Sequence, residues 1–192
     1  MTGAPEAPES GRFTALSRVL HWLTAILVFS ALFVGFVMVN SVGDYATLIL
    51  IHWTLGITIL VVVLVRVVNR FTHHPPPWPP TVGRLEGKIV VLSERLLYAL
   101  LLAQPVIGWA MVSAGGEPVV VFDALRLPRI APFDAQLFWL LRQAHSVVAY
   151  TLMAAIAAHV SAILLHTVTL RDRMIERMTF RFRPKGHRSR LG

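Results

Sequence analysis

Four long apolar stretches constrain the fold of this chain. Each is rich in Leu, Val, Ile and Ala and reaches the roughly 20 residues that a helix needs to cross a lipid bilayer. The hydrocarbon core offers no water to backbone N–H and C=O groups, so such stretches must be helical. We therefore predict an all-α integral membrane protein, an up-down four-helix bundle forming a single membrane domain over residues 1–192. The predicted helices cover Ser17 to Val39, Ala46 to Val68, Val91 to Val112, and Arg142 to Leu170.

The connections between these stretches support the bundle. The segment Asn40 to Tyr45 is short enough to make the first two helices antiparallel neighbours. The segment Thr72 to Gly83 is rich in proline and is predicted to be a stiff extended loop. The first apolar stretch is longer than the apolar region of a signal peptide, so we expect no cleaved signal.

The basic residues predict the orientation. If the N-terminus is cytoplasmic, all but three of the 18 lysines and arginines face the cytoplasm, the exceptions being Arg126, Arg129 and Arg142. We therefore expect both termini to be cytoplasmic, with a basic tail at residues 171–192 that is solvated or meets anionic lipid. A specific docking role for this tail stays an alternative. A nucleic-acid partner would require the basic residues behind the net charge of +8 to gather in a groove or patch, but they lie at the ends of the predicted helices, so we expect none.

The amino-acid composition limits the kinds of metal site and cofactor that this chain can have. The chain is 55% hydrophobic and only 15% charged, a balance that a soluble domain of this size could not hide. It contains no cysteine, which excludes disulfides, iron–sulfur clusters and covalently attached c-type haem. Any metal must therefore be held by His, Met or carboxylate groups.

Two histidines in the fourth predicted helix suggest two stacked cofactors. His145 and His159 are fourteen residues apart, which places them about 40° apart on one helical face and about 21 Å apart along the axis. One metal could not reach both. A single histidine in a membrane span is more often a packing residue, but ionisable groups at matched depths mark a functional pathway.

Each of these histidines has a partner at equal depth on another helix. His21 lies about one turn from the inner end of the first helix, and His52 lies about two turns from the outer end of the second. Depth therefore pairs His21 with His159 around an inner haem iron and His52 with His145 around an outer one. Both irons would be six-coordinate, which favours electron transfer over oxygen or substrate activation.

Arginines near these histidines are candidate partners for haem propionates. Arg18 precedes His21 by three residues, and Arg142 precedes His145 by three, so each lies one turn nearer its own membrane surface. Interfacial snorkelling explains both equally well. Arg66 is a weaker candidate of the same kind.

Several glycines and tryptophans also lie within the predicted helices. Gly35, Gly56 and Gly108 would allow close helix packing or make space for a macrocycle, and helix packing is the simpler interpretation. Trp22 and Trp53 each follow a candidate ligand directly, and we interpret them as interfacial anchors.

The remaining histidines are poorer ligand candidates. His166 lies seven residues beyond His159, but an iron there would lie about 31 Å from His145, at the membrane interface. We interpret His166 as a protonatable group near an inner quinone site, with plain interfacial burial as the alternative. His73 and His74 in the proline loop and His187 in the tail are expected to be solvated, although the adjacent pair could bind adventitious metal.

Several motifs together resemble the bacterial cytochrome b561 family, which consists of four-helix di-haem proteins of the inner membrane. The resemblance covers about Arg12 to Met178. Its carriers are Leu-His-Trp at 20–22, Ile-His-Trp at 51–53 with Gly56, Gln-Pro-Val-Ile-Gly-Trp from Gln104, Gly-Glu-Pro-Val at 116–119, and the spacing of His145 and His159. The family's four haem ligands match His21, His52, His145 and His159, and a further family histidine matches His166.

The resemblance implies an oxidoreductase with two b-type haems, located in the bacterial inner membrane, with ubiquinone as co-substrate. One class in the family oxidises superoxide at the outer surface and passes the electrons to ubiquinone. The outer arginines could steer that anion, but they are outnumbered by the acidic residues Asp44, Glu117, Asp123 and Asp134. An electron-transfer subunit or anchor of a partner dehydrogenase or hydrogenase is the main alternative, and a structural protein without cofactor is the third. The sequence does not give the oligomeric state.

Overall fold

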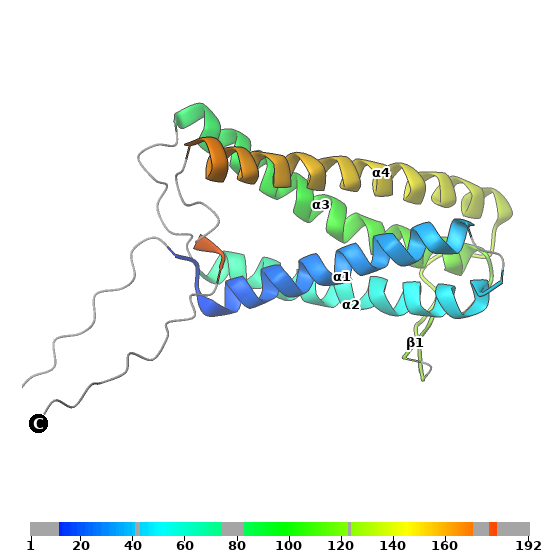
Figure 1. The fold of residues 1–192 in the computed structure, drawn as a ribbon. Coiled ribbons are helices and arrows are strands. Elements are labelled where there is room, and N and C mark those ends of the chain that lie inside the picture. The colour runs from blue at the N-terminus through cyan, green and yellow to red at the C-terminus, as the bar shows by residue number, and fades with distance from the viewer. Residues whose placement is uncertain (1–11, 41–42, 74–82, 123, 171–176, 180–192) are drawn as a thin grey trace, which may run out of the picture.

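A computed structural model describes residues 12–40, 43–73, 83–122, 124–170 and 177–179. In these ranges the chain forms four long helices and a two-stranded hairpin (Figure 1). All four helices are long and apolar enough to cross a membrane, which confirms the predicted all-α membrane bundle. The helices are α1 (Ala15–Asn40), α2 (Tyr45–Thr72), α3 (Arg84–Ala114) and α4 (Ala135–Leu165), the last continuing into a π-helical turn, η1 (His166–Leu170).

The helices pack as two antiparallel pairs. α1 packs on α2 and α3 on α4, and α2 also contacts α3. At most 17% of the residues in the most apolar window of any helix are buried. Large apolar side chains such as Phe29, Phe33 and Phe36 are exposed along α1, as expected of a surface that faces lipid.

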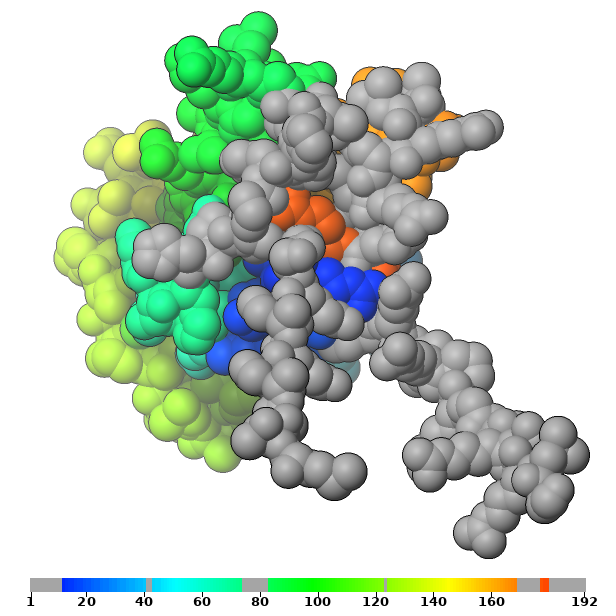
Figure 2. All heavy atoms as spheres, turned by 90° about the vertical axis from the view of Figure 1, so that its left-hand side faces the viewer, coloured from blue at the N-terminus to red at the C-terminus, as the bar shows by residue number. Residues whose placement is uncertain are grey.

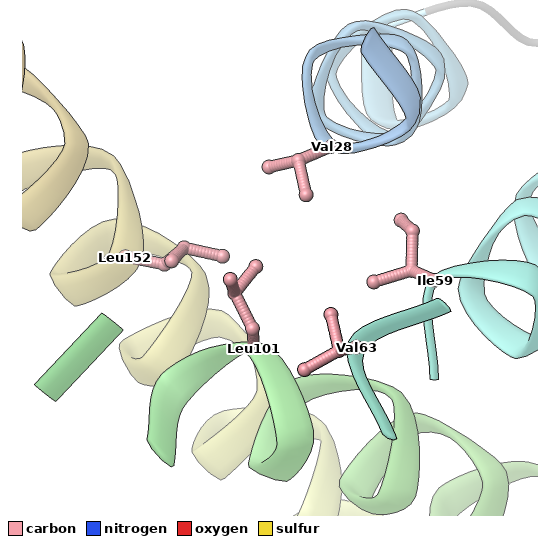
Figure 3. Packing of buried hydrophobic residues seen from close by; sticks show 5 residues of the cluster. All are labelled: Val28, Ile59, Val63, Leu101 and Leu152. Carbon is pink, nitrogen blue, oxygen red and sulfur yellow. The ribbon is translucent and has the colours of Figure 1, made fainter. Parts of the chain in front are cut away.

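The bundle core is an apolar layer near the middle of the helices, to which all four contribute (Figure 3). Val28 of α1, Ile59 and Val63 of α2, Leu101 of α3 and Leu152 of α4 are its buried members. Val63 is completely buried. This layer joins the two helix pairs at one depth of the bundle.

Two helices begin seven residues earlier than the sequence predicted. α3 starts at Arg84 rather than Val91, and the Glu86 carboxylate accepts a hydrogen bond from the backbone N–H of Gly83 at 3.0 Å. α4 starts at Ala135 rather than Arg142, because Asp134 accepts from the N–H of Leu137 at 2.8 Å. The added turns of α3 are polar, so hydropathy misses them. Those of α4, residues 135–141, are mostly apolar, and the prediction wrongly began this span at the charged Arg142.

A small hairpin between α3 and α4 was not predicted. Its antiparallel strands are β1 (Val120–Val121) and β2 (Leu125–Arg126). The hairpin and its flanks pack against Trp53 and Trp109, and the Trp109 indole donates to the carbonyl of Pro128 at 3.0 Å. The two tryptophans therefore hold this loop against one end of the bundle.

The opposite end carries both described ends of the chain. The N–H of Phe13 donates to the carbonyl of Arg177 at 3.3 Å, and the Trp22 indole donates to the carbonyl of Met178 at 3.0 Å. Figure 2 looks onto this end of the bundle. The two ends thus lie on one side of the membrane, and the assignment of that side to the cytoplasm stays a prediction.

Two predicted segments fall mostly outside the described residues. The proline-rich loop is described only at its ends, and the basic tail is not described at all beyond residue 179. His74 and His187 lie in these parts of the chain, so the structure places neither.

Candidate functional site

Two of the predicted site histidines meet at the level nearer the hairpin. His52 of α2 and His145 of α4 are half-buried, and their imidazole rings lie 6.2 Å apart between centres, at 77° to one another. Each ring rests on a glycine of the preceding helix. A Cβ atom at Gly35 would lie 3.3 Å from Cε1 of His52, and one at Gly108 would lie 3.1 Å from Cε1 of His145. The two glycines therefore make room for the two imidazoles.

Each of these imidazoles has a buried ring nitrogen. The Nδ1 atoms of His52 and His145 are buried and make no well-formed hydrogen bond with a described residue, although the Ala31 backbone is close enough to interact with His52. Gln104 of α3 restrains the second ring, since its Nε2 lies 3.1 Å from Nε2 of His145 and donates to the His145 carbonyl at 3.1 Å. Both Nδ1 atoms face the neighbouring glycines, 3.6 Å from a Cβ built at Gly35 and 3.4 Å from one built at Gly108, so a haem iron would be bound through the opposite ring nitrogen, Nε2. In His145 the Gln104 amide lies at that nitrogen.

A second polar group lies at the level nearer the chain ends. Arg66 of α2 places Nη2 at 3.0 Å from Nδ1 of His21, and its guanidinium stands 5.2 Å from the centre of the Tyr98 ring. His159 of α4 is close enough to interact electrostatically with both His21 and Arg66. The four helices thus bring His21 and His159 to one level around a central guanidinium.

The next turn of α2 carries a second arginine in a different setting. Arg70 donates to both carboxylate oxygens of Glu94 in α3, at 2.9 and 3.2 Å. A bidentate pair of this kind neutralises the charge. Among the described residues Arg66 has no carboxylate at salt-bridge distance, so its charge stays uncompensated by the protein.

The apolar core layer separates the two polar levels. Leu152 lies seven residues from His145 and seven from His159, which places it about 10 Å along α4 from each (Figure 3). In α2, Ile59 likewise lies seven residues from His52 and seven from Arg66. The bundle therefore has two polar sites with a layer of apolar side chains between them.

Comparison with protein families matches residues 12–181 to the family described as prokaryotic cytochrome b561. The chain belongs to this family. It is therefore a membrane electron-transfer cytochrome that carries b-type haem, and it is a multi-pass protein of the bacterial inner membrane.

Three curated relatives match most of the cytochrome. A probable superoxide oxidase of Yersinia pestis, CybB, is 26% identical over 170 residues, covering 87% of this chain and 95% of the relative. Cytochrome b561 homolog 2 of Escherichia coli K12 is 29% identical over 163 residues, covering 79% of this chain and 82% of the relative. Cytochrome b561 homolog 1 of the same strain is 24% identical over 170 residues, covering 87% and 96%.

The geometry at His52 and His145 fits the haem of this cytochrome. His52 and His145 would hold the haem iron between them, and metal–nitrogen bonds of about 2 Å would require ring centres roughly 6 Å apart. The observed separation is 6.2 Å. In the parts of the chain that the structure describes, no group of three or more His, Asp or Glu side chains could hold a bare metal ion. A cofactor that brings four ligands of its own is what this pair can hold.

The predicted propionate and quinone residues lie at the expected ends. Arg18 donates through Nη1 to the carbonyl of Thr179 at 3.1 Å, so this side chain also holds residues 177–179 against the start of α1. Arg142 is exposed near the hairpin end of α4, and His166 is half-buried at the start of η1. Their proposed roles toward haem and quinone stay predictions.

Other singled-out residues have structural contacts. His73 is exposed and its Nδ1 lies 2.9 Å from the Thr72 hydroxyl, in keeping with a solvated position. Trp22 is held by the carbonyl of Met178, and Trp53 packs beside the hairpin.

The sequence did not predict the contacts of Gln104, Glu94 and Arg70. Gln104 was recognised only as part of a family motif, although a polar amide inside an apolar span is itself a signal of function. Glu94 and Arg70 carry the same signal, but their pairing depends on how α2 and α3 are rotated about their axes. Sequence spacing within one helix cannot supply that rotation.

Proposed function

We propose that this cytochrome binds two b-type haems, one between His52 and His145 and one between His21 and His159, and that it exchanges electrons with a membrane quinone. The observation that carries the proposal is the facing pair of half-buried imidazoles, whose ring centres lie 6.2 Å apart. Each haem would supply one-electron redox chemistry at its own depth in the membrane.

The residues around each pair have distinct tasks. Gly35 and Gly108 let neighbouring helices approach the imidazoles closely, and Gln104 fixes the orientation of one of them. Arg66 supplies a positive charge at the inner level, where it would favour a haem propionate or another anion. The apolar layer between the levels excludes water and so hinders proton leakage across the membrane.

For the reaction we propose superoxide as electron donor at the hairpin end and ubiquinone as acceptor near His166. The support is similarity to a relative named a probable superoxide oxidase, which this chain covers over 95% of its length. Two superoxide anions would lose one electron each and become dioxygen. One ubiquinone would take up both electrons and two protons to become ubiquinol.

Haem quantification of purified protein tests the haem proposal. Wild-type protein should contain two haems per chain, and alanine substitution of His52 or of His159 should remove one. His73→Ala is the matched control, because His73 is exposed and hydrogen bonds to Thr72. Equal haem content in all four proteins would overturn the proposal. Helical content by circular dichroism should be equal in all four, so that a loss of haem is not a loss of fold.

A separate assay tests the reaction. Detergent-solubilised cytochrome, supplied with a superoxide source and a ubiquinone analogue, should produce ubiquinol faster than the uncatalysed mixture. The His166→Ala variant should bind both haems and reduce quinone more slowly. A rate no higher than the uncatalysed one, in protein with two haems, would refute superoxide as donor and leave the haem assignment intact.

A further inference from the structure

A cationic groove runs along the first turns of α3, away from both histidine levels. It is lined by Arg84, Lys88 and Arg95, with Gly87 and the apolar Val91 and Leu92 beneath them. Figure 2 looks onto this end of the bundle, where the first turns of α3 (green) stand at the rim of the face. None of these residues takes part in the proposed haem sites.

The three cations share one helical face and have no partner in the described chain. Their spacings of four and seven residues keep them within about 40° of one another around α3. All three side chains are exposed, and no ion pair to them is found among the described residues. The nearby carboxylates are already engaged, Glu86 with the N–H of Gly83 and Glu94 with an arginine of α2.

Gly87 at the centre of the groove has no packing partner that requires it. A Cβ atom added there would meet no described atom within 4 Å. Glycine in a helix interior is less stable than alanine, so a glycine without a close neighbour needs another reason. Here its effect is to leave the groove open beside the cations.

The groove lies where a membrane presents phosphate. Arg84 and Lys88 belong to the polar turns of α3 that precede its apolar part, while Val91 and Leu92 begin that part. Side chains on a helix lean toward its N-terminus, so Arg95 reaches back toward Lys88. Arg84 and Lys88 therefore stand at headgroup depth, Val91 and Leu92 lie below them, and Arg95 adds a positive charge one turn beyond these apolar side chains.

We propose that this groove binds an anionic phospholipid of the surrounding leaflet, with its phosphate held by Arg84 and Lys88, its acyl chain lying on Val91 and Leu92, and Arg95 adding positive charge one turn beyond them. The charge complementarity argues for an anion, and the apolar floor argues for a lipid rather than free phosphate. A zwitterionic lipid should bind much more weakly than an anionic one, because its headgroup has no net charge.

Native mass spectrometry of the haem-loaded protein tests this proposal. The protein is exchanged into detergent with phosphatidylglycerol, with phosphatidylcholine, or with inorganic phosphate alone, and bound adducts are counted. Wild-type protein should retain one phosphatidylglycerol at least ten times more tightly than phosphatidylcholine, and phosphate alone should leave no adduct. Equal retention of both lipids, or displacement of the lipid by phosphate, would overturn the proposal.

Three variants test whether the lipid binds in this groove or is attracted by the general positive charge of the surface. The triple variant Arg84→Gln, Lys88→Gln, Arg95→Gln should lose at least tenfold in phosphatidylglycerol affinity. The charge-matched control replaces Arg181, Arg183 and Lys185 of the tail by Gln and should lose much less affinity, because the tail can attract lipid only through its general charge. Gly87→Leu fills the groove without changing any charge and should also weaken binding. An equal loss in both triple variants, or unchanged binding by Gly87→Leu, would refute a built site. Unchanged haem content in every variant shows that the fold is kept.

Discussion

Enlarging Gly108 by a single methyl group tests how closely α3 approaches the outer haem ligand. The new Cβ would lie 3.1 Å from Cε1 of His145, about 0.3 Å closer than the 3.4 Å at which ordinary contact begins. The imidazole has little freedom to yield, because Gln104 bonds to the backbone and lies against the ring of the same residue. Metal–ligand distances are kept within about 0.2 Å, so the shift exceeds what the iron site tolerates.

The expected result is a graded loss of the outer haem. Gly108→Ala should lower its affinity by about 10- to 100-fold, as for other disturbances next to a metal ligand. Gly35→Ala should have a smaller effect, since its Cβ would lie 3.3 Å from His52. Gly87→Ala is the control on the same helix as Gly108, with no described atom within 4 Å of its Cβ.

The assay is titration of haem-depleted protein with haem, followed by reduced-minus-oxidised spectra. The order of outer-haem affinity should be Gly87→Ala equal to wild type, then Gly35→Ala, then Gly108→Ala. If Gly108→Ala binds its outer haem as tightly as Gly87→Ala and with the same spectrum, the close approach has no role in ligation.

Three further outcomes follow from the same geometry. Arg66→Gln should lower the midpoint potential of one haem by tens of millivolts in a potentiometric titration. The reason is that an uncompensated charge is worth on the order of 1–2 kcal/mol at an effective dielectric of ~20. Arg70→Gln should give a smaller shift, because Glu94 already neutralises the charge of Arg70. Gly56→Leu should reduce haem content to one per chain, because the open face one turn after His52 would be filled, and two haems in this variant would place the macrocycle elsewhere. Gln104→Leu should broaden the spectrum of the outer haem alone, as electron paramagnetic resonance can check, and an unchanged signal would show that the amide does not orient His145.

The sequence predicted the features that depend on one helix at a time. The spans followed from apolar length, and the levels of His145 and His159 followed from helical rise, because both quantities are fixed by residue count. Two neighbours of the ligands were also noticed, but Gly35 and Gly108 were interpreted as helix packing. In the structure they contact the imidazoles themselves, a role that requires knowing which helix lies against which.

The sequence did not predict features that depend on helix caps or on how one helix is rotated against another. The start of α3 was missed because its first turns, with Glu86, are polar and precede the apolar span. The start of α4 was missed because the cap at Asp134 was not recognised and the span was begun at Arg142. The hairpin was missed because strands of two residues carry no detectable period. The contact of Arg66 with His21 arises only when α1 and α2 are docked, so the sequence could name Arg66 but not its partner.

The pairing of the four histidines is tested most directly by double variants and their haem content. His52→Ala combined with His145→Ala removes both ligands of one proposed site, and should leave one haem per chain. His52→Ala combined with His159→Ala disables both sites, and should leave none. Our account predicts this difference between the two double variants. Equal haem content in the two, or one haem in the second and none in the first, would contradict it.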